Sequence, residues 1–265
     1  MDFSFVQISD HHLLASDNAL HRGFSTAWAF RQVMAHIADT YANDIDFIIS
    51  TGDLAQNGSE DEYAFVSEML SMEKESPAPG PQRISFEGLQ RVPMYFLPGN
   101  HDSRYNFYRQ LFPASRPAEL VNAKFEYQGI RFICIDWGPT TNANLNQQLL
   151  DFLSEALQQD QPAIIMMHHQ VVPLGHALLD GFIAEDMDKF WNILAGHNIL
   201  GIFSGHVHTN YETHARGIPV FGTGATSFQF AIEDDELLMY LKPIPYRLVT
   251  LQNGELSTMI VEVPI

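Results

Sequence analysis

The order of the short apolar runs narrows the fold of this chain to one class. Up to residue 203, runs of strand length alternate with amphipathic stretches of helical spacing. Strands are predicted at 3–8, 46–50, 92–97, 130–135, 163–167 and 199–203, and helices at 26–38, 60–71, 145–157 and 184–194. Beyond residue 203 the pattern predicts strands at 210–214, 219–221, 227–232 and 246–251. Such an order favours one mixed α/β domain over residues 1–265, with two packed sheets.

Three segments interrupt this alternation. Gln128-Gly129, after a short run at 124–127, and Asn253-Gly254 both stand between strand-like runs, and each predicts a tight hairpin. Residues 72–91 carry three prolines, two glycines and mixed charge without a clear period. We expect most of that stretch to be a surface insertion or mobile loop, which could cap a site.

The charge and composition exclude several kinds of partner. The formal net charge of −18 disfavours binding to nucleic-acid polymers and to anionic membranes, because both are polyanions. Cys134 is the one cysteine, so neither an intrachain disulfide nor a thiolate zinc cluster is expected. The sequence shows neither the pattern of a signal peptide nor an apolar run long enough to span a membrane, which predicts a cytoplasmic protein.

Five short polar clusters stand directly after predicted strands. They are Asp10-His11-His12, Gly52-Asp53, Gly99-Asn100-His101-Asp102, His168-His169 and Gly205-His206-Val207-His208. In open α/β sheets, ligands gather at the carboxyl ends of the strands. Each cluster alone could be an ordinary turn, a surface pair or a partly buried histidine pair. Five clusters of the same chemistry in the same structural position favour a shared metal site instead.

The donor atoms of these clusters restrict the metal. Asp10 and His12 are two residues apart and point the same way from extended backbone, and His206 and His208 repeat that spacing. Asp53 offers two carboxylate oxygens and could bridge two ions. Oxygen and imidazole donors suit Mn, Fe or Zn rather than copper(I) or an iron–sulfur cluster.

As a set, the five clusters resemble the pattern of the calcineurin-like metallophosphoesterases over nearly the whole chain. That pattern is the series Asp-x-His, Gly-Asp, Gly-Asn-His-Asp, His and Gly-His-x-His. Within that superfamily the chain is similar to the class III cyclic nucleotide phosphodiesterases and the related glycerophosphodiesterases. The similarity rests on residues 52–56 and 97–102, on Gln148, on His168-His169 followed by Pro173 and Gly175, and on Ser227-Phe228-Gln229-Phe230. The resemblance implies a four-layer α-β-β-α sandwich with two mixed β-sheets.

The resemblance also implies a role for each position. One metal ion would be held by Asp10, His12 and His208, the other by Asn100, His168 and His206, with Asp53 bridging them. His101 would donate a proton to the leaving oxygen, and Asp102 would hold its ring. Capping a helix near Arg104 is the alternative role for Asp102. The chain departs from the family at Gln170 and Val171, where prolines usually follow the histidine pair.

These roles predict a two-metal hydrolase of small phosphodiesters. Two divalent ions carry four positive charges, which the carboxylates of Asp10 and Asp53, one bridging hydroxide and a diester monoanion neutralise in full. We expect 3′,5′-cyclic AMP as the substrate, with a glycerophosphodiester or a phosphomonoester as alternatives. A nuclease is disfavoured by the net charge, and a non-catalytic interaction module would be expected to lack ligands that are all present here. Relatives of this kind suggest a homodimer.

Four further residues near the clusters are candidates for other roles. His21 and His176 lie in loops near the clusters and are either substrate contacts or surface residues. Asp136 follows a predicted strand and either orients a ligand histidine or caps a turn. Arg104 is the one arginine near the clusters and could meet the second charge of a phosphomonoester.

Overall fold

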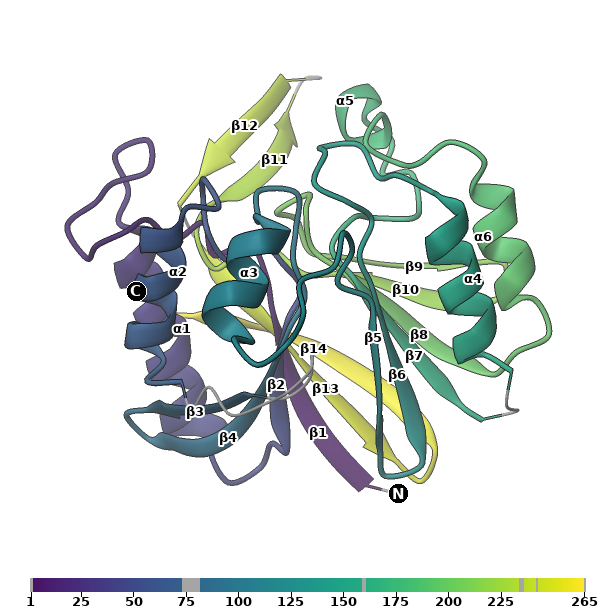
Figure 1. Cartoon of the computed structure of the whole chain (residues 1–265), viewed down its shortest axis with the longest axis horizontal. Coiled ribbons are helices and arrows are strands. Elements are labelled where there is room, and N and C mark those ends of the chain that lie inside the picture. Colours follow the sequence, from purple (N-terminus) through teal and green to yellow (C-terminus); the bar gives the residue numbers. More distant parts are fainter. Residues whose placement is uncertain (1, 73–81, 159–160, 234–235, 242, 265) are drawn as a thin grey trace.

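The structure is a computed structural model that describes residues 2–72, 82–158, 161–233, 236–241 and 243–264 (Figure 1). Its first six-stranded sheet has the order β14 (Glu255–Val263), β13 (Ile244–Gln252), β1 (Asp2–Ile8), β2 (Phe47–Ser50), β4 (Leu89–Phe96) and β3 (Gln82–Phe86). The second has the order β5 (Ala123–Tyr127), β6 (Ile130–Ile135), β7 (Ala163–Met167), β8 (Ile199–Ser204), β10 (Ile218–Gly222) and β9 (Tyr211–Ala215). A separate hairpin joins β11 (Gln229–Glu233) to β12 (Glu236–Tyr240).

Both sheets are parallel at the centre and antiparallel at their edges. Strands β1, β2 and β4 pair in parallel, as do β6, β7, β8 and β10. The hairpins β5–β6 and β13–β14 form at the predicted turns, where Gln128 and Asn253 adopt positive φ before a glycine. Because parallel strands all end on the same edge of a sheet, the loops that follow them are brought together.

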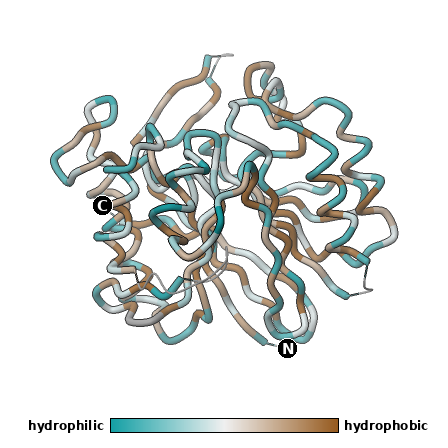
Figure 2. Tube along the Cα trace, in the orientation of Figure 1, coloured by the Kyte–Doolittle hydropathy of each residue, from teal (hydrophilic) through white to brown (hydrophobic). Residues whose placement is uncertain are grey.

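Alternation along the central strands supplies two different hydrophobic layers. Phe3 and Phe5 of β1 point between the sheets, where they meet Phe47 of β2 and Phe132 of β6. Val6 and Ile8, on the opposite face of β1, belong to the core under α1. Figure 2 shows the hydrophobic colouring concentrated along the central strands. The region between the sheets is thus an apolar layer built mainly from aromatic rings.

Helices cover the outer face of each sheet (Figure 1). The first sheet is covered by α1 (Thr26–Tyr41), α2 (Glu60–Met69) and α3 (Arg104–Leu111), and the second by α4 (Gln147–Ala156) and α6 (Met187–Leu194). A short helix, α5 (Ala177–Asp180), precedes α6. The four-layer α-β-β-α sandwich with two mixed sheets is therefore confirmed. None of the helices in the described ranges is long and apolar enough to cross a membrane.

The expectation of a loop over most of 72–91 is wrong for its second half. Residues 73–81 lie outside the described residues, but β3 and the start of β4 form an antiparallel edge hairpin through Gly88. The side chains of Gln82 and Ile84 are buried while that of Arg83 is exposed. This alternation is the signal of a strand, and the neighbouring prolines and glycines obscured it.

Candidate metal centre

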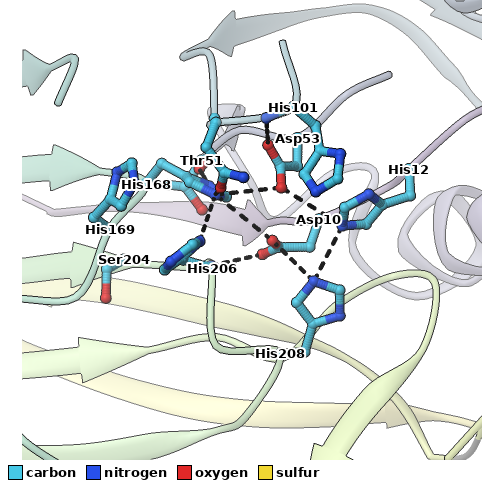
Figure 3. Close-up of polar contacts among 12 residues, drawn as sticks. Asp10, His12, Thr51, Asp53, His101, His168, His169, Ser204, His206 and His208 are labelled. Atoms are coloured by element: carbon cyan, nitrogen blue, oxygen red, sulfur yellow. Dashed lines mark hydrogen bonds and ion pairs between the residues drawn. The ribbon is translucent and has the colours of Figure 1, made fainter. Parts of the chain in front are cut away.

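The predicted ligands converge at the carboxyl ends of five strands (Figure 3). They follow β1 (Asp10 and His12), β2 (Asp53), β4 (Asn100), β7 (His168) and β8 (His206 and His208). Five of the seven, Asp10, His12, Asp53, His206 and His208, have φ between 47° and 70°. Non-glycine residues seldom adopt this region, and such strain concentrates at functional sites. The backbone here is shaped to turn these side chains inward.

One group of donor atoms joins the ends of β1 and β8. His12 Nε2 lies 3.1 Å from His208 Nε2, and His208 Nε2 lies 3.3 Å from Asp10 Oδ1. Asp53 Oδ2 lies 3.6 Å from His12 Nε2. These four side chains are buried and point toward one another (Figure 3).

A second group joins the ends of β4, β7 and β8. His168 Nε2 lies 3.1 Å from Asn100 Oδ1 and 3.2 Å from His206 Nδ1. Asp53 Oδ2 lies 3.4 Å from the same Nε2 atom. Asp53 therefore stands between the two groups, in the position expected for a bridging carboxylate (Figure 3).

Backbone carbonyls fix the orientation of two imidazoles. His168 donates from Nδ1 to the carbonyl of Thr51 at 2.9 Å, and His208 donates from Nδ1 to the carbonyl of Phe228 at 2.7 Å. In the neutral ring, each Nε2 atom then carries a lone pair directed into the cluster. This second hydrogen bond is the usual support of a metal-binding histidine.

The donor set fits cations. Asp10 Oδ1 is buried without a hydrogen-bond partner, and it faces His208 Nε2 and, at 3.9 Å, His168 Nε2. Lone pairs and a carboxylate oxygen converge at such distances only with protons or cations between them. Described groups that could hold a metal include Asp10, His12 and His208, and also Asp10, Asp53 and His168.

The electrostatics of the cluster also favour the binding of cations. Burial lowers the pKa of an imidazole, yet the carboxylates of Asp53 and Asp10 raise the pKa of His168 to about 9. Burial raises the pKa of a carboxylate, yet His168 and His12 hold the pKa of Asp53 well below its usual range. The cluster thus keeps its carboxylates ionised and attracts positive charge, and a metal would compete with a proton for His168 Nε2.

His101 borders the cluster without belonging to either donor group. Its backbone N–H donates to Asp53 Oδ1 at 2.8 Å, and its Nδ1 atom donates to the carbonyl of Gln56 at 2.8 Å. The ring lies edge-on to His12, with centroids 4.8 Å apart. This hydrogen bond does not involve Nε2 of His101, so Nε2 is available for a contact with a ligand in the cleft.

The expectation that Asp102 holds the ring of His101 is wrong. The Asp102 carboxylate accepts hydrogen bonds from the backbone of Gly99, Leu54 and Ala55 and from the hydroxyl of Tyr63, at 2.6–3.2 Å. The alternative, a cap on α3, is wrong too, because Ser103 caps that helix. Asp102 instead ties the loop after β2 to the loop after β4.

Arg104 and Asp136 form a buried pair rather than part of the donor set. The guanidinium of Arg104 donates to both oxygens of Asp136 and to the carbonyls of Gly99 and Asp102. Asp136 also accepts from the backbone of Val121 and Gly138. Asp136 therefore holds its own turn and Arg104 rather than a ligand histidine, and the guanidinium of Arg104 is occupied by Asp136 and two backbone carbonyls.

A cleft of about 210 Å³ opens over the cluster. The predicted residues that line it are His12, Asp53, Asn100, His101, His206 and His208, together with His21. His176 is not among the lining residues. Sequence reasoning missed Arg22, Gln56, Thr141, Phe182, Phe228 and Phe230 as lining residues. Phe228 and Phe230 had a signal, since both lie in the family-like segment 227–230.

Two further histidines are buried beside the cluster. His11 contacts the hydroxyls of Thr226 and Ser50 through its two ring nitrogens, so neither nitrogen is available to the donor groups. His169 donates from Nε2 to the carbonyl of Thr140. Of the pair at 168–169, His168 is thus the one whose Nε2 atom faces the cluster.

Glycines let the loops of the cluster approach one another. A Cβ atom on Gly52, which has φ +109°, would lie 2.7 Å from both Gly99 N and His168 Nδ1. A Cβ atom on Gly99 would collide with Asp53. The Gly-Asp and Gly-Asn-His-Asp motifs therefore need their glycines for close packing of the ligand loops.

The chain is similar in sequence to named proteins. A family model described as calcineurin-like phosphoesterase matches residues 3–210. A protein of Colwellia psychrerythraea named as a probable cyclic nucleotide phosphodiesterase is 31% identical over 271 residues, covering 97% of this chain and 94% of that protein. A protein of Vibrio vulnificus named 3′,5′-cyclic adenosine monophosphate phosphodiesterase CpdA is 28% identical over 261 residues, covering 96% of this chain and 88% of that one.

Solved structures share the fold at low sequence identity. A dimetal phosphatase from Danio rerio superposes with a TM-score of 0.62 at 13% identity and covers 99% of both chains. A purple acid phosphatase from yellow lupin superposes with a TM-score of 0.67 at 15% identity, covering 99% of this chain and 52% of that one. With the match over residues 3–210 and the 31% identical relative, the chain belongs to the calcineurin-like phosphoesterase family.

Proposed function

We propose that this protein is a two-metal phosphodiesterase that hydrolyses 3′,5′-cyclic nucleotides, with cyclic AMP as the preferred substrate. The observation that carries the proposal is the pair of donor groups that share Asp53 at the floor of the cleft. The names of relatives that match over most of the chain support the cyclic nucleotide as substrate. A glycerophosphodiester is the alternative that the same site would accept.

The two ions would be held by separate sets of side chains. We infer that Asp10, His12 and His208 hold one ion, that Asn100, His168 and His206 hold the other, and that Asp53 bridges them. Bound metals would supply an activated water and would neutralise charge on the phosphate. Mn, Fe(II) and Zn all suit oxygen and imidazole donors, so supply in the cell would decide which is bound.

His101 is proposed to protonate the leaving oxygen. Nδ1 donates to the carbonyl of Gln56, so the proton to be transferred would be the one that Nε2 carries when the ring is an imidazolium, and His101 lines the cleft. An alkoxide is a poor leaving group without that proton, and general acid catalysis contributes about 10²–10⁴-fold. The backbone N–H of His101 holds the carboxylate of Asp53, so one residue both supports the cluster and donates the proton.

A substrate panel on metal-stripped and reloaded protein tests the proposal. Protein loaded separately with Mn, Fe(II) and Zn is expected to cleave cyclic AMP and bis(4-nitrophenyl) phosphate, while the stripped protein is inactive. Asp53→Asn should lower metal content and activity together, because the bridging charge is lost. Loaded protein that cleaves only glycerophosphodiesters would favour the alternative substrate. Loaded protein that cleaves no phosphoester would favour a non-catalytic interaction module.

Three properties of the whole protein remain proposals. We infer that residues 1–265 act as one domain, because β13 and β14 at the end of the chain complete the sheet that β1 begins. A homodimer is supported by the half-exposed apolar side chains of the β11–β12 hairpin, among them Ile232 and Tyr240. Sedimentation velocity tests the dimer, and cell fractionation tests the cytoplasmic location.

A further inference from the structure

Arg22 is the one lysine or arginine among the described residues that line the cleft. The chain has 14 basic residues against 32 acidic ones, so a basic side chain at this place does not follow from composition. The cleft otherwise offers imidazoles, amides, a carboxylate and aromatic rings. Arg22 therefore gives the described lining of the cleft a permanent positive charge.

A tight turn presents Arg22 to the cleft. The backbone N–H of His21 donates to the carbonyl of Phe24 at 2.8 Å, and the N–H of Phe24 donates back at 2.9 Å. Between them Arg22 and Gly23 have φ of 49° and 89°, as in a two-residue type I′ turn. Asn, Asp or Gly is preferred at the first central position, and another residue there costs on the order of 1 kcal/mol. Arg22 occupies a position that local backbone preference alone disfavours.

Contacts of the loop that precedes Arg22 anchor this turn. The ring of His21 stacks on Phe228 with centroids 5.4 Å apart, and Phe228 packs against the rings of His12 and His208. Earlier in the same loop, Arg31 of α1 holds both oxygens of Asp17 at 2.9 and 3.1 Å. The turn is thus fixed relative to the donor groups through two stacked rings.

The guanidinium of Arg22 is available for a ligand. In the described part of the chain it makes neither a hydrogen bond nor an ion pair, and the nearby carboxylate of Asp17 is engaged by Arg31. Arg104, the other arginine near the clusters, is buried against Asp136. Among the lysines and arginines that the structure describes, Arg22 is therefore the one placed at the cleft to meet an anionic group that exceeds what the metals neutralise.

The charge balance identifies that group. Two divalent ions, the carboxylates of Asp10 and Asp53, one hydroxide and a phosphodiester monoanion sum to zero, so a phosphomonoester dianion that binds beside the hydroxide adds one negative charge. We infer that Arg22 binds this second charge, so that the resting cleft, with its hydroxide in place, holds an added phosphomonoester more tightly than a phosphodiester. The inference rests on the proposed function for the identity of the site. Arginine forms strong paired hydrogen bonds with phosphate oxygens, which suits this role.

Two ligands that differ by one methyl group and one charge test the inference. Dissociation constants for monomethyl phosphate and dimethyl phosphate are measured by isothermal titration calorimetry at pH 8 on Mn-loaded protein, where the monoester is a dianion because its second pKa is near 6. The wild type is expected to prefer the monoester. Arg22→Gln should raise the dissociation constant of monomethyl phosphate about 10-fold or more, which corresponds to the loss of one charged hydrogen bond. The dissociation constant of dimethyl phosphate should change by less than about 2-fold. Arg22→Lys should keep part of the preference.

Arg83→Gln is the matched control, because it removes the same charge from an exposed position on β3. It should change neither constant, and metal content must be equal in all variants. Equal weakening of both ligands by Arg22→Gln, or weakening of neither, would overturn the inference. Binding is measured without turnover, so failure of the protein to cleave cyclic AMP would sink the proposed function while leaving this comparison intact.

Discussion

The contribution of the His101 imidazole to kcat should depend on how strongly the leaving group requires a proton. We predict that His101→Asn lowers kcat for cyclic AMP by about 10²–10⁴-fold, because an alkoxide would then leave unprotonated. The effect on bis(4-nitrophenyl) phosphate should be far smaller, since nitrophenolate leaves readily without a proton. Steady-state kinetics on both substrates, with metal content measured alongside, check this. An equal loss on both would assign His101 to metal binding or structure instead.

Asp102 is predicted to act on stability rather than on proton transfer. Its carboxylate accepts from three backbone N–H groups and from Tyr63, and Asp102→Asn replaces one of the two acceptor oxygens with a donor. Burial and the charge of Asp53 raise the pKa of Asp102, but its hydrogen-bond donors favour the ionised form. We expect a loss of about 2–4 kcal/mol in unfolding free energy. Thermal denaturation measures it, and a changed pH–rate profile with unchanged stability would contradict this role.

The set of residues that converge at the site could be predicted from the sequence, whereas the contacts of each individual side chain could be predicted less well. The seven proposed ligands could be found because each follows a strand, and parallel strands share an edge. The hydrogen-bond partners of Asp102 could not be predicted, because its position next to His101 in the sequence does not determine the direction of its side chain in a loop. Arg22 was missed because its place at the cleft depends on a turn and on rings packed between distant segments.

At the scale of the elements, the site depends on how closely the loops after β2 and β4 approach. We predict that Gly52→Ala disrupts the donor groups, because its Cβ atom would lie 2.7 Å from Gly99 N and His168 Nδ1. Metal content and thermal stability should both fall. Gly196→Ala is a matched control, since Gly196 also has positive φ, at +85°, but its Cβ atom would meet nothing within 4 Å. Equal effects of the two substitutions would mean that backbone strain alone matters there.

Elements with a clear period were predictable, and those at the edges were not. The central strands and α1 carry unbroken apolar repeats, so their existence followed from pattern alone. The β3–β4 hairpin was missed because Gly88 and the prolines of residues 72–91 are usual signs of a loop. The helix predicted at 184–194 begins only at Met187, because Asp186 adopts positive φ. Edge elements depend on pairing that short windows do not contain.

For the whole molecule, the layer of aromatic rings between the sheets should make the two halves unfold together. Phe47 stands at its centre, stacked on Phe5 at 5.0 Å and edge-on to Phe132 of the other sheet at 5.4 Å. We predict that Phe47→Ala lowers the unfolding free energy by about 3–5 kcal/mol. Met259→Ala, at an exposed position of β14, should have little effect.

Two tryptophans can report on the halves separately. Trp28 lies on α1, which covers the first sheet, and the buried Trp137 follows β6 of the second. In variants in which Trp28 or Trp137 is the one remaining tryptophan, with Trp191 also replaced, denaturant should produce coincident fluorescence transitions, and Phe47→Ala should shift both by the same amount. Such coincidence is expected because neither sheet can keep its inner face buried once the other is lost. If the two transitions separate and Phe47→Ala shifts only one of them, the sheets fold as independent units. The donor groups, which come from both sheets, would then assemble only after each sheet has folded.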